Sequence, residues 1–205
     1  MDITIDISKT ILETDRLILR PWKEADLNDF YQYASIPGVG EMAGWKYHNS
    51  IEVSEKILLS FISGKNVFAI VYKENNKVIG SLGLHNSWAN DESSYSNLKL
   101  KEVGYVLSKD YWGNGLMPEA LTEVIKFCFN TCNLDALTIC HFSSNNQSRR
   151  VIEKCGFKFV KQSKYFAKQL DLTFDDMKYV LLNKANLYLP YSSINSIDNI
   201  EFNKK

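Results

Sequence analysis

The chain has 205 residues, of which 45% are hydrophobic and 23% charged; these values are typical of one globular domain and exclude collagen-like, coiled-coil and wholly disordered proteins. Its 24 Lys and Arg residues balance 24 Asp and Glu residues, so the sequence lacks the basic excess of proteins that bind nucleic acid or anionic lipid. No apolar run reaches the roughly 18 residues of a membrane helix, and the N-terminus is acidic rather than basic and then apolar. We therefore expect a cytoplasmic protein without nucleic-acid or membrane partners.

Hydrophobic periodicity predicts an alternation of strands and helices. In chain order these are a strand over 16–20, helices over 27–34 and 50–62, strands over 67–72, 78–84 and 102–107, a helix over about 116–130, a strand over 136–140, a helix over 148–154, and strands over 157–166 and 173–182. This order predicts an α/β protein with a mixed sheet and helices on both faces. The strand–helix–strand unit from Glu102 to Cys140 should form a parallel pair.

Three segments lack clear hydrophobic periodicity: residues 37–50, residues 88–97 and the C-terminal residues 185–205. Residues 37–50 carry many large side chains, which suits a lid or a pocket wall, although ordinary packing needs the same residues. Residues 88–97 are polar and rich in Ser and Asn, which predicts a flexible connection. No repeat or domain boundary is visible, so we expect one domain over residues 1–184 and a C-terminal tail over 185–205, flexible or docked.

The first candidate for ligand binding is the segment YWGNGLMPEA over 111–120, which follows a predicted strand and opens a helix. Glycines let the backbone approach a ligand closely, and the free N–H groups of a first helical turn attract an anion such as a pyrophosphate. A tight turn before a helix is the alternative for this segment taken alone. It is neither a Walker loop nor a GxGxxG dinucleotide fingerprint.

The second candidate is the segment NNQSRRVIEKCGF over 145–157. Taken alone it needs no ligand, because Asn145 or Ser148 can cap a helix and Gly156 can end it.

The four cysteines, at positions 128, 132, 140 and 155, lie in apolar surroundings, and none of the three histidines has zinc-ligand spacing to them. We therefore expect buried, reduced thiols and no metal site.

Four segments carry a family resemblance when they are taken together and in order. They are TDRLILRP over 14–21, EVGY over 102–105, WGNG over 112–115 with Glu119 and Ala120, and the segment over 145–157. The set resembles the GNAT superfamily of acetyl-CoA-dependent N-acetyltransferases, and most of all its branch of ribosomal-protein N-terminal (serine or alanine) acetyltransferases. It frames about residues 12–184. The resemblance implies the GNAT fold, a mixed, mostly antiparallel, twisted sheet of about seven strands with splayed central strands and helices on both faces.

The resemblance implies that acetyl-CoA lies where the strand ending near Leu107 splays from the next one. It assigns the diphosphate to the glycine segment, the pantetheine arm to the end of that strand, and a hydrogen bond with the arm to Asn145. The residues so assigned are Tyr105, Val106, Leu107, Trp112, Gly113, Asn114, Gly115, Leu116, Met117 and Asn145. Trp112 stands where the family has Gln or Arg, which predicts the loss of a side-chain contact to phosphate, and Met117 replaces a small residue.

The resemblance also implies the catalytic groups. Glu102 stands where the family often holds a carboxylate and is the candidate base, directly or through water; a solvated strand residue is the alternative. His85 is the second candidate base or a substrate contact, with a structural histidine as the alternative. Ser148 would face the thioester sulfur as a hydrogen-bond donor or relay, since Ile152 stands where many relatives have tyrosine. A backbone N–H near Val106 would polarise the carbonyl.

The expected reaction moves an acetyl group from acetyl-CoA to a primary amine, either a protein N-terminal α-amine or a small-molecule amine, by direct attack in a ternary complex. The alternative is a non-catalytic acyl-CoA-binding or sensing module of the same fold, which would keep the glycine segment and Asn145. A kinase or dehydrogenase is disfavoured, because no Lys follows the glycines and GxGxxG is absent. A homodimer is common among similar proteins, and the sequence does not identify the acceptor.

Overall fold

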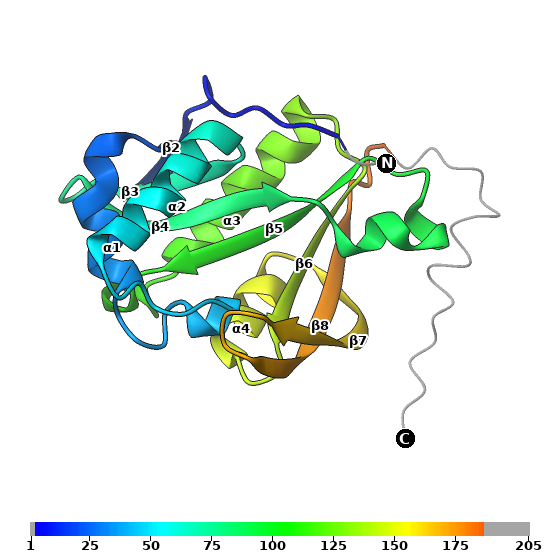
Figure 1. The fold of residues 1–205 in the computed structure, drawn as a ribbon. Helices are drawn as coiled ribbons and strands as arrows, with labels where there is room; N and C mark the ends of the chain where they lie inside the picture. Colours follow the sequence, from blue (N-terminus) through cyan, green and yellow to red (C-terminus); the bar gives the residue numbers. More distant parts are fainter. Residues whose placement is uncertain (1–2, 187–205) are drawn as a thin grey trace.

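The alternating strands and helices assemble into one eight-stranded sheet between two layers of helices (Figure 1). The computed structural model describes residues 3–186. The strands are β1 (Leu12–Glu13), β2 (Leu17–Pro21), β3 (Val67–Tyr72), β4 (Lys77–His85), β5 (Leu100–Leu107), β6 (Ala136–Phe142), β7 (Lys158–Ala167) and β8 (Leu172–Leu182). The helices are α1 (Leu27–Ala34), α2 (Ile51–Gly64), α3 (Leu116–Lys126) and α4 (Asn146–Lys154). Short 3₁₀ helices cover Glu24–Asp26, Glu41–Ala43, Trp88–Asp91, Ser93–Tyr95 and Lys109–Tyr111, and a π turn covers Phe127–Thr131.

The strand order β1-β2-β3-β4-β5-β6-β8-β7 confirms the predicted mixed, mostly antiparallel sheet. Only β5 and β6 run parallel within the described sheet, and they are the pair that was predicted from the strand–helix–strand unit. The sheet has one strand more than expected. That strand, β1, has two residues, which are too few for the alternation that reveals a strand in a sequence.

The strand β3 shows why the central strands are continuously apolar. Val67, Ala69 and Val71 pack with the layer of α1 and α2. Phe68 and Ile70 pack with the layer of α3. Because successive side chains of a strand point to opposite faces, a strand that is covered on both faces needs apolar residues throughout.

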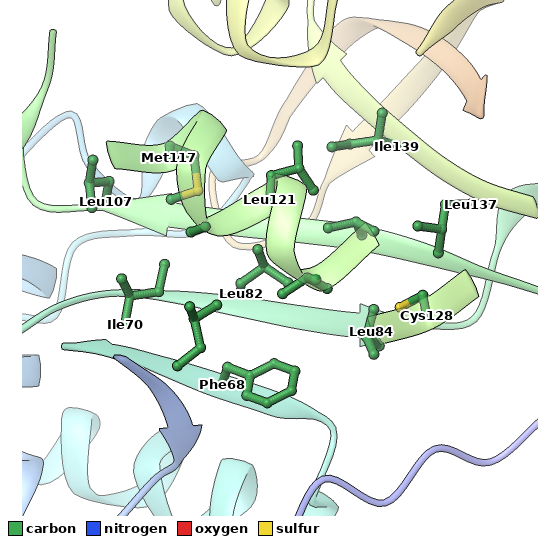
Figure 2. Close-up of a cluster of buried hydrophobic side chains, with 14 of the residues drawn as sticks. Phe68, Ile70, Leu82, Leu84, Leu107, Met117, Leu121, Cys128, Leu137 and Ile139 are labelled. Carbon is green, nitrogen blue, oxygen red and sulfur yellow. The ribbon is translucent and has the colours of Figure 1, made fainter. Parts of the chain in front are cut away.

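The helix α3 closes the second layer by burying one face against the sheet. Figure 2 shows Met117 and Leu121 of this helix turned toward strand residues that include Leu82 and Leu107. Burial of an aliphatic side chain of this size stabilises the fold by about 1.5–3 kcal/mol. The buried residues of α3 are Leu116, Met117, Ala120, Leu121 and Val124. Their spacing is the helical pattern that predicted this element.

The strands β5 and β6 are paired over only part of their length. Pairing joins Leu100–Val103 to Ala136–Ile139, and both strands continue beyond it. From that point they diverge, and Figure 1 shows β5 and β6 running apart. We call the opening between Gly104–Leu107 and Cys140–Phe142 the fork. It is the pair of splayed central strands that the resemblance implied.

The connection between β4 and β5 differs from the flexible segment predicted over 88–97. It forms two short 3₁₀ helices, and Ala89, Tyr95 and Leu98 are buried against the sheet. The hydroxyl of Ser87 accepts from the N–H of Ala89 at 3.0 Å and so caps the first turn. The prediction of flexibility was wrong for a physical reason. The polar residues of this segment form the hydrogen-bonded turns, and its few apolar residues pack those turns against the sheet.

The tail predicted over 185–205 lies almost entirely outside the described residues, which end at 186. Among the helices of residues 3–186, none combines the length and hydrophobicity that crossing a membrane requires.

Candidate active site

The fork opens into a cleft of about 1290 Å³. Strands β4, β5 and β6, the glycine segment, α4, the loop over 42–49 and the β7–β8 hairpin supply its walls. Enzymes hold small ligands in clefts of this kind, which combine apolar walls with a few polar groups. The predicted site residues that line it are His85, Glu102, Tyr105, Val106, Leu107, Trp112, Gly113, Gly115, Leu116, Met117, Asn145 and Ser148. Asn114 is the predicted residue that does not.

The glycine segment offers unpaired main-chain donors. Gly113 and Gly115 have φ angles of 79° and 73°, in the left-handed region that glycine adopts without steric cost. Within the described part of the chain, no backbone N–H of residues 113–117 donates to a protein acceptor. Free N–H groups at the start of a helix attract anions, and the helix dipole adds to the attraction. The segment therefore carries the donors that a diphosphate needs.

Arg16 of the TDRL segment contacts the glycine segment and the first turn of α3. Its guanidinium forms an ion pair with Glu119 of α3 at 2.6 Å and donates to the carbonyl of Asn114 at 3.0 Å. The hydroxyl of Thr14 donates to the same Glu119 carboxylate at 2.5 Å. Burial opposes ionisation of Glu119, but these hydrogen bonds outweigh it and lower the pKa of the carboxyl. The start of β2 thus braces the glycine segment and the first turn of α3.

Three residues of the glycine segment take positions that the sequence did not define. The indole Nε1 of Trp112 donates to the carbonyl of Leu107 at 2.8 Å, so this side chain ties the segment to the end of β5. Asn114 is exposed, and its carbonyl is taken by Arg16. The side chain of Met117 is buried in the core between α3 and the sheet (Figure 2).

Asn145 begins α4 and caps its first turn. Its Oδ1 accepts from the N–H of Ser148 at 3.1 Å, which confirms the capping role that the sequence allowed. Its Nδ2 donates to the carbonyl of Met42 at 3.4 Å. The Asn145 amide therefore joins α4 to the loop over 42–49, and its hydrogen bond with a pantetheine arm stays a prediction.

Tyr105 reaches from β5 to α4 and contacts the predicted leaving-group residue. Its hydroxyl lies 2.8 Å from Oγ of Ser148 and 3.3 Å from the Ser148 carbonyl oxygen, and its single hydrogen can be donated to either of them. Burial raises the pKa of Tyr105, so the phenol stays protonated. When Tyr105 donates to Ser148 Oγ, the hydroxyl hydrogen of Ser148 is free to point at a third atom. The sequence did not predict this side-chain pair.

Glu102 lies half-buried at the last paired residues of β5. Burial raises the pKa of its carboxyl, and two donors oppose that shift, the Trp88 N–H at 3.3 Å and the Cys140 thiol at 3.4 Å. A carboxylate with a raised pKa in a cleft is suited to accept a proton near neutral pH.

His85 faces Glu102 across the β4–β5 pair. Its ring lies over Gly83 and Gly104, and a Cβ at Gly83 would collide with ring Nε2. Burial lowers the pKa of His85, and the charge of Lys101 lowers it further. The ring is still reachable through the cleft, so His85 stands where an acceptor or a proton-carrying water can meet it.

Cys140 and Asp176 also line the cleft and were not among the predicted site residues. The sequence did contain a signal for Asp176. Asp175 and Asp176 are consecutive in a predicted strand, so their side chains point to opposite faces and one of them turns inward. Elsewhere in residues 3–186, as in the cleft, no group of three or more His, Cys, Asp or Glu side chains is arranged to hold a metal ion.

The chain is similar to known acetyltransferases over most of its length. Residues 16–158 match the model of the Acetyltransferase (GNAT) domain family. An uncharacterized N-acetyltransferase of Bacillus subtilis, YoaA, is 26% identical over 153 residues, which are 72% of this chain and 82% of the relative. The chain therefore belongs to the GNAT family of acetyltransferases.

Solved structures share the fold. An acetyltransferase (GNAT family) from Bacillus anthracis has a TM-score of 0.73 at 20% identity, over 84% of this chain and 98% of its own. A ribosomal-protein-S5-alanine acetyltransferase from Vibrio fischeri has a TM-score of 0.66 at 21% identity, over 89% and 100%. The microcin self-immunity acetyltransferase MccE, solved with acetyl-CoA and AMP, has a TM-score of 0.67 at 15% identity, over 83% and 94%. Proteins of this family are acetyltransferases.

Proposed function

We propose that this protein transfers an acetyl group from acetyl-CoA to a primary amine, a protein N-terminal α-amine or a small-molecule amine, by direct attack in a ternary complex. The observation that carries the proposal is the fork, because it joins unpaired main-chain donors at the glycine segment to a carboxylate with a raised pKa, Glu102. A non-catalytic acyl-CoA-binding module would need the first feature and not the second.

The chain's own groups suit the parts of acetyl-CoA. The unpaired N–H groups over 113–117 would hold the diphosphate, and the free edge of β5 at Tyr105, Val106 and Leu107 would run beside the pantetheine arm. Acetyl-CoA supplies the activated acyl group; the protein orients it and removes protons. A main-chain N–H near Val106 remains our candidate to polarise the carbonyl.

Glu102 is the proposed base, directly or through one water, and His85 is the second candidate. An α-amine with a pKa of about 8 costs about 1.4 kcal/mol to deprotonate at pH 7, whereas a lysine side chain with a pKa of about 10.4 costs about 4.6 kcal/mol. An α-amine or an amine of similar basicity therefore needs only modest help from Glu102.

Ser148 is the proposed donor to the departing thiolate. A serine hydroxyl is too weak an acid to protonate the sulfur alone, so its role is a hydrogen bond or a relay. The contact with Tyr105 is compatible with this role: in the arrangement where the Tyr105 hydroxyl donates to Ser148 Oγ, the serine hydrogen is left for the sulfur.

Two measurements test the proposed function. Acetyl-CoA, but not ATP or NAD, should raise the melting temperature of the protein, since only a ligand that fits the folded state stabilises it. Free thiol should then appear when acetyl-CoA is mixed with a panel of primary amines. Stabilisation without thiol release over the whole panel would favour the binding module, and no stabilisation by acetyl-CoA would contradict both functions. The single domain over 1–184, the cytoplasmic location and a homodimer stay predictions.

A further inference from the structure

We propose that Asp176 and Glu102 form an acceptor subsite that binds the ammonium group of a cationic primary amine whose neighbouring group carries no negative charge. This inference rests on the acetyl-transfer function proposed above. It adds a binding residue, Asp176, and narrows the chemical class of the acceptor.

The two carboxylates lie on one face of the sheet, beside the fork. Glu102 of β5 is paired with Thr138 of β6. Asp176 of β8 is paired with Phe142 of β6. Directly paired residues point to the same face, and so do residues two apart along a strand. Thr138, Cys140 and Phe142 therefore share their face with both carboxylates.

The thiol of Cys140, on the strand between them, separates the two carboxylates. Its Sγ donates to Glu102 Oε1 at 3.4 Å. Asp176 faces the same thiol, although its Oδ1 does not reach hydrogen-bond geometry with it. Burial and the two neighbouring carboxylates raise the pKa of Cys140, so the group stays a neutral thiol. The hydrogen-bond donor between Glu102 and Asp176 is therefore a weak, neutral thiol.

One oxygen of the Asp176 carboxylate, Oδ1, is buried without a hydrogen-bond partner in the part of the chain that the structure describes. Its side chain is part of the cleft wall and the residue is only 4% exposed. Within residues 3–186, nothing donates a hydrogen bond to its Oδ1. A buried charged oxygen without a donor is costly, and an ammonium group supplies three donors together with a positive charge. An ammonium group in the fork would donate hydrogen bonds to both the Asp176 and the Glu102 carboxylates and place a positive charge between them.

Lys178 is the basic residue that acts on both carboxylates. It is paired with Cys140, and its Nζ lies over the ring of Trp88, 5.0 Å from the centroid. Burial raises the pKa of Asp176 and of Glu102, and the charge of Lys178 partly offsets that shift. This one lysine is shared by the two carboxylates.

The two nearby histidines differ in their effect on the carboxylates. Burial lowers the pKa of His85, with a further contribution from Lys101, so its imidazole is neutral at neutral pH. His141 is buried, with Nε2 3.2 Å from the Tyr179 hydroxyl; it lowers the pKa of Asp176, as Lys178 does, but it has no such effect on Glu102. An incoming ammonium would therefore add a donor for the unsatisfied Oδ1 of Asp176 and a positive charge beside Glu102.

The rest of the acceptor would meet apolar surface. Met42, Tyr47 and Tyr165 are 42%, 44% and 47% exposed and line the cleft. An amine with an apolar or aromatic body fits these walls. A carboxylate next to the amine would instead be placed beside Glu102 and Asp176 in a partly buried site, where like charges repel strongly.

Three acceptors with one ring test this exclusion: 2-phenylethylamine, phenylalanine amide and phenylalanine. With acetyl-CoA and the wild-type protein, the first two should release thiol with at least about tenfold higher kcat/KM than the third, since a like-charge contact costs several kcal/mol. Equal turnover of all three would overturn the inference. This comparison needs no variant and so does not depend on how a substitution folds.

The variant Asp176→Asn tests the residue itself, with Asp175→Asn as the matched control. Asp175 points to the other face and binds Lys164 and Gln162, each at 2.7 Å. Binding of 2-phenylethylamine to CoA-saturated protein, measured by calorimetry, should weaken roughly tenfold in Asp176→Asn and stay unchanged in Asp175→Asn. Acetyl-CoA binding should be unchanged in both variants.

The outcomes separate the subsite from the catalytic function. Amine binding that depends on Asp176 without any thiol release would sink the proposed function and leave the subsite standing. If Asp176→Asn releases thiol as fast as the wild type does, the proposed function stands and the subsite is wrong. If 2-phenylethylamine does not bind the wild-type protein, or binds both variants equally well, the subsite is wrong.

Discussion

The two sides of the fork are built in different ways. On the side of α3, the glycine segment offers main-chain groups, and Arg16 braces it through Glu119 and the Asn114 carbonyl. On the other side, the cleft presents side chains, which include the Glu102 carboxylate and an Asp176 carboxylate whose Oδ1 has no donor among the described residues. Its walls come from loops that are far apart in the chain.

The difference follows from what each side has to recognise. A diphosphate and a pantetheine arm can be held by backbone donors, which any sequence supplies once the chain is bent correctly. An amine must be distinguished by charge and shape, which only side chains provide. The first side is therefore readable as a motif, and the second is particular to this chain.

The largest expected effect comes from the carboxylate at the fork. Glu102→Gln should lower kcat/KM for the amine by about 10²–10⁴, since it removes a general base. The acid limb of the wild-type pH–rate profile should disappear, because that limb reports protonation of Glu102, whose pKa is raised by burial. Glu123→Gln on the outer surface of α3 is the control. An unshifted profile in Glu102→Gln would assign the base to another group.

A smaller effect is expected on the leaving-group side. Ser148→Ala should lower kcat about tenfold, the loss of one hydrogen bond to a charged atom, while KM for acetyl-CoA changes little. Tyr105→Phe should lower kcat less. If Tyr105 acts through Ser148, adding Tyr105→Phe to Ser148→Ala should have no further effect. Independent, additive losses would show that the pair does not work as a unit.

Loss of the Arg16 contacts that brace the glycine segment should have a smaller effect, limited to the binding of acetyl-CoA. Arg16→Ala should raise KM for acetyl-CoA roughly threefold to tenfold, because the ion pair with Glu119 and the bond to the Asn114 carbonyl are lost. KM for the amine should not change. Lys126→Ala, which removes a surface ion pair of α3, is the control. Equal effects on both KM values would mean that the two sides are not separate.

The smallest effect concerns stability. The folded pKa of Glu102 lies above its unfolded value, so its contribution to stability falls as pH rises from the ordinary carboxyl pKa of about 4.3 through the raised one. Glu102→Gln removes this penalty. The variant should melt at a higher temperature than the wild type at neutral pH, and the difference should shrink in acid. A scan of melting temperature against pH for both proteins decides it.

The fold and the cosubstrate side were predictable from the sequence for a physical reason. Strands covered on both faces, such as β3, and an amphipathic helix such as α3 leave strong periodic patterns. The glycine segment and the Asn145 cap depend on local backbone geometry, which local sequence encodes. The assigned roles of these residues toward acetyl-CoA stay predictions.

The acceptor side was not predictable to the same degree. Asp176 meets Cys140 and Glu102 only because β8 lies beside β6 in the sheet, and the separation along the chain hides that contact. The pair of Tyr105 and Ser148 likewise joins a strand to a helix more than forty residues away. Long-range pairing of side chains leaves no periodic signal, so such contacts need the structure.

The partial pairing of β5 and β6 has a consequence for self-association. A strand that lacks a neighbour exposes main-chain groups, and at the rim of a protein such an edge invites other chains to add to it. Here the free edges lie in the middle of the sheet, with a strand and helices on either side, so a small extended molecule can reach them and a foreign strand cannot. Because the sheet opens at its centre, the unpaired main-chain N–H and C=O groups of β5 and β6 can bind a ligand, but they do not promote aggregation.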